Sequence, residues 1–94
     1  MEITKQNETF NLTDVTETFK MNGSVSCDVY GSLSIHFTVT NTDDDYIGDC
    51  HYNKQRESDI INYSIDCSES NRDSLTLYTD TVIDSVLEYI TAIQ

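Results

Sequence analysis

Residues 32–40, SLSIHFTVT, carry the clearest structural signal in this chain. Leucine, isoleucine, phenylalanine and valine occupy every second position, and serine, histidine and threonine fill the positions between them. A two-residue period places the apolar side chains on one face of a strand and the polar side chains on the other. The segment is therefore predicted to be a β-strand with one buried face and one face toward solvent.

The same alternation appears on both sides of this strand. Residues 24–29 alternate in the same way, and residues 30–32, YGS, supply a short turn, so we expect a hairpin. Residues 60–67 repeat the pattern and predict another strand. These three segments indicate an antiparallel sheet.

Two further segments give weaker strand signals. Residues 46–52 predict a strand that places Tyr46, Gly48, Cys50 and Tyr52 on one face, although a glycine weakens a strand interior and often marks a bulge. Near the N-terminus we expect an edge strand at residues 8–13, followed by another strand or a short helical turn. Together with the hairpin and residues 60–67, this favours a sheet of about four strands.

After Cys67 the period of the apolar residues changes from two to three or four, the spacing of one helical face. We predict a C-terminal helix over residues 73–92. Residues 70–73, SNRD, have the form of a capping box, and Asp73 or Ser74 is an alternative cap. The residues of the expected apolar face are Leu75, Tyr78, Val82, Val86, Tyr89, Ile90 and Ile93.

The order of strands first and helix last predicts an α+β fold, an antiparallel sheet with the C-terminal helix packed on one face. With 94 residues, the chain is expected to form a single domain over residues 1–94. Its net charge raises the alternative of disorder. However, 37% of the residues are hydrophobic, proline is absent and the apolar residues are patterned, so folding is favoured.

Acidic residues dominate the charge of the chain. It has 17 Asp and Glu against 5 Lys and Arg, a formal net charge of −12. Solubility alone needs a net charge of only about 2–8 in magnitude. The acids include a loop cluster, Asp43, Asp44, Asp45 and Asp49, and a predicted helical row, Asp80, Asp84 and Glu88, whose four-residue spacing puts them on one side of the helix.

Three explanations compete for this charge: a solvated surface that resists aggregation, adaptation to high salt, and an acidic surface that occupies a strongly basic groove. Grooves of that kind are typical of proteins that handle nucleic acid. Long-range attraction to such a groove would speed association, and salt would weaken it. Tyr46 and Tyr52, beside the loop acids, would add apolar contact and hydrogen bonds. Direct binding of nucleic acid is disfavoured because a charge of −12 repels phosphate.

Catalytic and cofactor motifs are absent from the sequence, which has no glycine-rich phosphate loop, no G-x-S-x-G and no H-E-x-x-H. A nucleophile pair of Cys50 with His36 is the one alternative, and buried structural thiols are favoured over it. The acidic loop lacks the alternating ligand order of an EF-hand, so we expect no metal and no cofactor. The chain is thus interpreted as non-enzymatic.

The three cysteines, Cys27, Cys50 and Cys67, fit no metal-binding spacing and are interpreted as reduced core residues of a cytoplasmic protein. The N-terminus lacks the basic start and apolar run of a signal peptide. No stretch approaches the roughly 20 apolar residues of a membrane helix, so no membrane partner is expected.

In its size, its acid excess, its lack of catalytic motifs and its strand-rich body with a terminal helix, the chain resembles the small acidic phage-encoded inhibitors of host defence, the DNA-mimic and anti-CRISPR proteins. The resemblance covers composition along the whole chain and rests on no aligned motif. It implies an inhibitor in the cytoplasm of the host bacterium that binds a CRISPR effector or another nucleic-acid enzyme and blocks its DNA or guide-RNA site.

The expected function is therefore inhibition of a basic nucleic-acid-binding protein. The expected partner-binding residues are Asp43, Asp44, Asp45, Asp49, Asp80, Asp84, Glu88, Tyr46 and Tyr52. Two alternatives stay open: a phage or virion structural or assembly domain that oligomerises through a sheet edge or helix face, and a divalent-cation-binding module.

Overall fold

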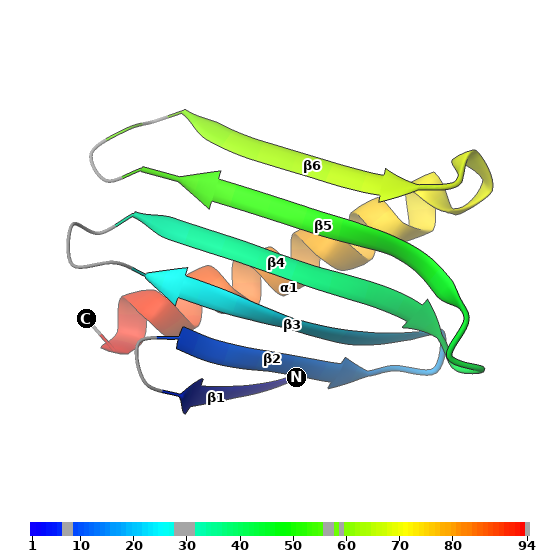
Figure 1. The fold of residues 1–94 in the computed structure, drawn as a ribbon, viewed down its shortest axis with the longest axis horizontal. Coiled ribbons are helices and arrows are strands. Elements are labelled where there is room, and N and C mark those ends of the chain that lie inside the picture. Colours follow the sequence, from blue (N-terminus) through cyan, green and yellow to red (C-terminus); the bar gives the residue numbers. More distant parts are fainter. Residues whose placement is uncertain (7–8, 28–31, 56–57, 59, 94) are drawn as a thin grey trace.

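The computed structural model describes residues 1–6, 9–27, 32–55, 58 and 60–93. Six antiparallel strands form one sheet in the order of the sequence, so that each strand pairs with the next one along the chain (Figure 1). The elements are β1 (Glu2–Gln6), β2 (Thr9–Val15), β3 (Phe19–Cys27), β4 (Leu33–Asn41), β5 (Tyr46–Lys54), β6 (Ile61–Cys67), the 3-10 turn η1 (Glu69–Asn71) and helix α1 (Arg72–Ile93).

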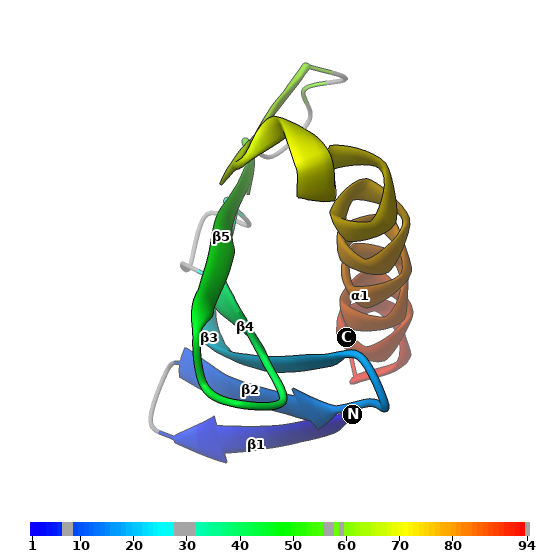
Figure 2. The same ribbon diagram turned by 90° about the vertical axis from the view of Figure 1, so that its right-hand side faces the viewer.

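Helix α1 packs across one face of the sheet, which gives two layers with the core between them (Figure 2). The α+β prediction is confirmed, and α1 lies within one residue of the predicted helix at each end. Six residues of the predicted apolar face that are fully or partly buried hold α1 to the sheet, and Ile83 and Thr79 join them in the buried stripe. The six are Leu75, Val82, Val86, Ile90 and the partly buried Tyr78 and Tyr89.

The alternation in the β4 sequence accounts for its position in the middle of the sheet. Ile35, Phe37 and Val39 are buried against the helix layer, while Ser34 and His36 are exposed on the other face, which we call the outer face. Because both neighbours of β4 also bury alternate residues, one continuous apolar surface faces α1. The predicted pairing of the β3 and β4 segments is confirmed, and most of their predicted turn lies outside the described residues.

The sheet has six strands, not about four, because the N-terminal region was predicted incorrectly. The segment predicted as an edge strand is β2, which lies inside the sheet between β1 and β3. The edge strand is β1, whose sequence EITKQ contains one apolar residue and so shows no alternation. Of the two alternatives for the next segment, the strand is correct, since Thr16 closes a turn with Phe19 and β3 begins there.

A β-bulge corrects the predicted face of Tyr46. Thr40 pairs with Tyr46 whereas Val39 pairs with Gly48, so Ile47 is an extra residue in β5. An extra residue moves everything before it to the opposite face of the strand. Tyr46 consequently lies on the outer face with 60% of its surface exposed, while Tyr52 lies in the core with 6% exposed.

The predicted capping box does not form at the start of α1. The 3-10 turn η1 directly precedes the helix. Its N-cap residue, Ser68, makes no side-chain cap hydrogen bond. The Ser68 hydroxyl instead accepts a hydrogen bond from Asn71 Nδ2 at 2.9 Å. Ser70 therefore lies within the 3-10 turn and does not cap the helix.

Candidate functional site

The β4–β5 turn presents Asp43, Asp44 and Asp45 to solvent. The Asn41 side-chain oxygen organises the turn, because it accepts hydrogen bonds from the backbone N–H groups of Asp43 at 2.9 Å and Asp45 at 3.0 Å. Asp44 has a positive φ of 67°, a conformation that aspartate tolerates better than most residues. Its carboxylate contacts Lys20 Nζ at 3.0 Å.

Asp49 lies on the outer face, where two hydroxyl groups hold its carboxylate. Tyr46 donates a hydrogen bond of 2.6 Å and Thr38 one of 2.7 Å. These bonds favour the charged carboxylate and lower the pKa of Asp49, with smaller contributions from His36 and His51. The hydrogen bond between Tyr46 and Asp49 also raises the pKa of Tyr46 to about 12, because it favours the neutral phenol.

Asp66 of β6 lies directly opposite Asp49 in the β5–β6 register. Like charges in such a cross-strand pair are destabilising. His36 Nε2 is 3.9 Å from Asp49 Oδ1, so a positive charge on His36 would offset this repulsion only when the ring is protonated. The sheet therefore keeps two acids together at an energetic cost.

These acids belong to a larger group at one end of the molecule, which we call the acidic end. The β2–β3, β4–β5 and β6–α1 connections all lie at this end (Figure 1), because alternate connections of an antiparallel meander share an end. Lys20 and Arg72 are the basic residues among them. The acidic end consists of Glu17, Asp43, Asp44, Asp45, Asp49, Asp66, Glu69 and Asp73. Asp14, near the end of β2, is not counted with them, because Tyr78 of α1 and the amino group of Met1 hold its carboxylate.

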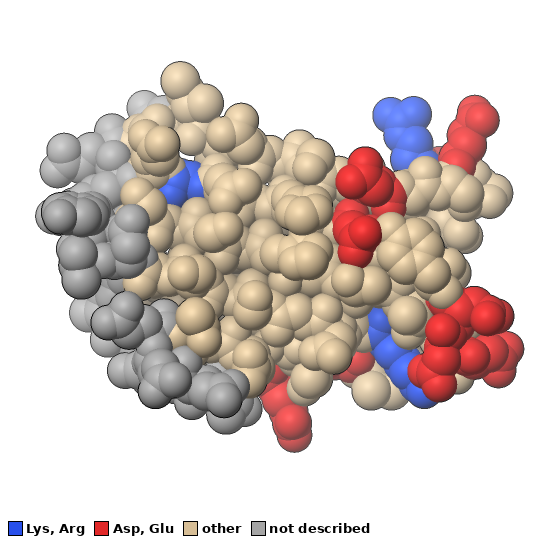
Figure 3. All heavy atoms as spheres, in the orientation of Figure 1, with Lys and Arg blue, Asp and Glu red and all other residues tan. Residues whose placement is uncertain are grey.

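Figure 3 shows this asymmetry on the outer face. Most of the visible acidic side chains gather at the right-hand end, and a broad area without charge lies to their left. On this face, serine, threonine and asparagine side chains alternate with the core residues of β2 to β5, together with the stacked rings of His36 and His51. On this face, the acidic side chains of the described residues therefore gather toward one end.

The helical row does not join the acidic end. Asp84 and Glu88 are exposed on α1, about three and four turns from the acidic end, and no ion pair or hydrogen bond holds their carboxylates among the described residues. Asp80 has a structural contact, since it accepts a hydrogen bond of 2.7 Å from Tyr63 of β6. The structure thus groups the predicted residues Asp43, Asp44, Asp45, Asp49 and Tyr46 and separates Asp80, Asp84 and Glu88 from them.

Tyr52 is not available to a partner, because its side chain is buried in the core beside Tyr63. Our prediction for Tyr52 rested on its closeness to the loop acids in the sequence, but the bulge in β5 puts Tyr46 and Tyr52 on opposite faces of the sheet. Tyr46 remains at the acidic end, next to Asp49.

Four acids of the acidic end were missed by the sequence reasoning: Glu17, Asp66, Glu69 and Asp73. Each lies in or beside a connection at the same end as the predicted loop, yet none belongs to a run of acids in the sequence. The available signal was the order of the strands, since it decides which connections share an end.

The alternative nucleophile pair does not form. Cys50 points into the core and His36 lies on the outer face, where its ring stacks on that of His51 with centroids 4.3 Å apart. Burial raises the pKa of Cys50 to about 12, which keeps it a thiol at neutral pH. Within the described ranges, no group of three or more His, Cys, Asp or Glu side chains could hold a metal ion.

Among the helical segments that the structure describes, none is long and apolar enough to cross a membrane. Comparisons of the chain with models of protein families, with curated proteins and with solved structures gave no match.

Proposed function

We propose that this chain is a non-enzymatic inhibitor that binds the basic nucleic-acid-binding groove of a bacterial CRISPR effector, or of a similar defence enzyme, in the cytoplasm of the host cell. The observation that supports the proposal best is the acidic end, where eight carboxylates meet two basic residues, Lys20 and Arg72. In this proposal the acidic end is the contact surface.

The physical argument is competition for the lysine and arginine side chains that otherwise bind phosphate. A protein charge of −12 attracts a positive groove over long distances and raises the association rate. Carboxylates at the acidic end then form charge-assisted hydrogen bonds with the basic side chains. Tyr46, exposed beside Asp49, adds apolar contact at the same place.

The cost that the fold bears supports a role in binding. Asp49 and Asp66 face one another across two strands, although an uncharged pair there would be more stable. A basic partner removes this cost, because its side chains neutralise both carboxylates in the complex. The resulting affinity falls as salt rises.

A competition experiment tests the proposal. Purified RNA-guided effector complexes are mixed with labelled target DNA and with the protein, and bound DNA is measured at low and at high salt. The protein is expected to displace DNA from at least one effector at low salt. A variant with Asp43→Lys and Asp66→Lys is expected to weaken competition by about tenfold or more.

The matched control carries Asp84→Lys and Glu88→Lys, which changes the net charge equally but on exposed helix positions away from the acidic end. This control is expected to compete nearly as well as the parent protein. Equal loss in both variants would mean that net charge acts without a defined contact surface. Full competition by the acidic-end variant would contradict the proposal.

A further inference from the structure

The two edges of the sheet differ in how well they are protected against pairing with another strand. Strands β1 and β6 each pair with one neighbour, so each has one open edge. β1 has only 5 residues, and a short edge strand is a common protection. β6 has 7 residues, contains no proline and carries only one charge, Asp66. Its edge is therefore the one that can accept a further strand.

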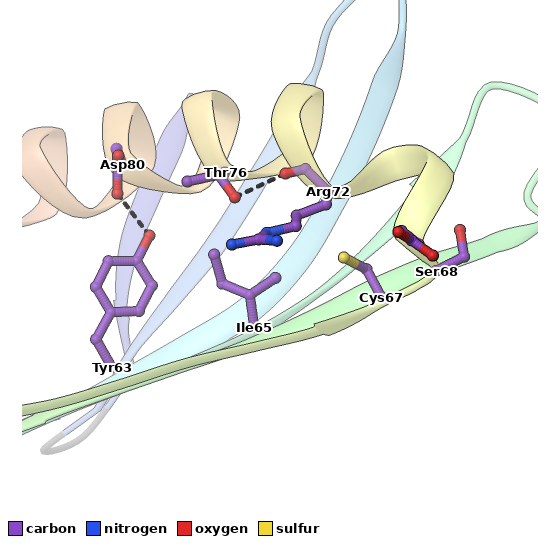
Figure 4. A pocket seen from close by; sticks show the side chains of 8 residues that line it. Tyr63, Ile65, Cys67, Ser68, Arg72, Thr76 and Asp80 are labelled. Atoms are coloured by element: carbon purple, nitrogen blue, oxygen red, sulfur yellow. Dashed lines mark hydrogen bonds between the residues drawn. The ribbon is translucent and has the colours of Figure 1, made fainter.

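A groove runs beside this open edge, between β6 and the first turns of α1 (Figure 4). It has a volume of about 520 Å³. Tyr63, Ile65 and Cys67 contribute the inward-facing side chains of β6, and Thr76 lies on the helix side of the groove. Tyr63 ends the groove, since its hydroxyl is hydrogen-bonded to Thr79 at 2.8 Å and to Asp80 at 2.7 Å.

The groove leaves apolar surface uncovered. Ile65, Cys67 and Tyr63 are only partly buried, although they pack against the core. Ile61, at the start of β6, is 44% exposed. A neighbouring strand would cover these side chains and would satisfy the free backbone groups of the β6 edge at the same time. This gap in the core layer is therefore at the same place as the open edge.

The charges around β6 select the occupant. Asp66 lies on the outer face of β6, and Glu69 and Asp80 line the groove on the inner side. Arg72 is exposed, its side chain lies between Ile65 and the helix (Figure 4), and it forms no ion pair among the described residues. A second copy of the chain would bring another charge of −12 to this edge, which opposes its association.

We propose that β6 binds an extended, basic segment of a partner protein as a seventh strand of the sheet. Alternate side chains of the segment have different roles, because successive residues of a strand point to opposite faces. Apolar side chains enter the groove over Ile65, and lysine or arginine side chains lie on the outer face beside Asp66 and Asp49. We call this the strand-addition site.

The inference that the partner segment is positively charged rests on the proposed function. The inference that the segment pairs with β6 as a strand does not. The acidic end binds a charged surface of any shape, and the strand-addition site requires backbone hydrogen bonds. The two can fail separately. If the Asp43→Lys and Asp66→Lys variant loses competition with DNA, but the parent protein binds no strand at β6, the proposed function stands and this inference is refuted.

The test uses a synthetic heptapeptide that alternates valine with lysine, capped at both ends, and the isotope-labelled full chain. Peptide is added while backbone amide signals and amide hydrogen exchange are followed by NMR. The expected result is saturable binding, with shifted signals and slowed exchange centred on β6. A peptide of the same charge with every backbone amide methylated cannot pair as a strand, and its binding is expected to be weaker by about tenfold or more.

Two tryptophan variants provide the matched pair on the protein. Thr76→Trp fills the groove from the helix side without changing a residue of the sheet, and it is expected to weaken peptide binding by about tenfold. Leu77→Trp is the control, because Leu77 is 72% exposed and does not line the groove. Arg72→Ala removes the one positive charge of the groove and is expected to strengthen binding of the lysine peptide.

Three results would overturn the inference. The first is no saturable peptide binding while the labelled chain is folded. The second is equal binding of the methylated peptide, which would show simple charge attraction. The third is dimerisation of the protein alone with slowed exchange in β6, which would show that a second copy occupies the edge.

Discussion

Tyrosine hydroxyl groups hold three of the aspartates in place. Tyr46 donates to Asp49 within β5, and Tyr63 donates to Asp80 between β6 and α1. Tyr78 donates to Asp14 at 2.7 Å, which ties the other side of α1 to β2. Burial raises the pKa of Tyr78 and Tyr63, and their carboxylate partners raise it further, so all these phenols stay neutral donors at physiological pH. A tyrosine hydroxyl within reach therefore makes an aspartate a structural hydrogen-bond acceptor, as at Asp14, Asp49 and Asp80.

The Tyr46–Asp49 bond predicts a measurable change in acid sensitivity. Tyr46→Phe removes the donor that lowers the pKa of Asp49 most, so the pKa of Asp49 is expected to rise toward its ordinary value of 3.8. The lowered pKa stabilises the fold above that ordinary value, and this stabilisation is lost as pH falls through the folded-state pKa. The parent should therefore be more stable than the variant at neutral pH, with the difference shrinking below about pH 4.

NMR titration of the carboxyl carbons measures the pKa, and urea unfolding at several pH values measures the stability difference. Tyr78→Phe is the control, because it removes a tyrosine–aspartate bond away from Asp49 and should leave the pKa of Asp49 unchanged. An unchanged pKa of Asp49 in the Tyr46→Phe variant would refute the role given to this bond.

Helix α1 combines a well-defined apolar stripe with a row of acids that weakens it. The stripe made the helix predictable to within one residue at each end, because a 3.6-residue period over 22 residues is hard to mistake. Asp80, Asp84 and Glu88 repel one another at four-residue spacing, and no basic residue lies in the last turn. Packing on the sheet therefore outweighs the cost of the row.

This row predicts that one substitution stabilises the helix. Asp84→Lys converts two repulsive pairs, with Asp80 and Glu88, into attractive ones at the same spacing. The expected gain is about 0.5–1 kcal/mol in the free energy of unfolding, measured by urea denaturation. Asp84→Asn, which removes the negative charge only, should give an intermediate gain. A parent protein as stable as Asp84→Lys at low salt would contradict the argument.

At the scale of the whole molecule, the charge lies unevenly on a thin two-layer fold. The radius of gyration is 13.2 Å. At about 0.01 M salt the Debye length is about 30 Å, so every carboxylate acts on every other one. At about 1 M it is about 3 Å, and only adjacent charges interact. The net charge of −12 should therefore destabilise the fold most at low salt.

We expect the melting temperature to rise with sodium chloride over this range, by about 5 °C for each kcal/mol of repulsion that is screened. Circular dichroism at several salt concentrations measures the effect. The variant with Asp43→Lys and Asp66→Lys carries less negative charge and should show a smaller rise. A melting temperature independent of salt in the parent would show that repulsion contributes little to its stability.

The sequence by itself determined the α+β class, the helix and the strands with strict alternation, since the periods of two and 3.6 residues are local properties of the chain. It did not determine β1 or the face of Tyr46. β1 exists because β2 offers it a partner, and Tyr46 changes face because a bulge arises where β5 pairs with β4.

Only the tertiary structure decided which acids act together. Asp66 and Glu69 are far from Asp43 in the sequence, yet the meander brings their connections to one end. In the sequence, the helical row looked equivalent to the acidic loop. In the structure it lies on the helix layer, and Asp80 accepts a hydrogen bond from Tyr63. The physical reason is that charge is a property of residues, whereas a charged surface depends on how strands pair and where each connection turns.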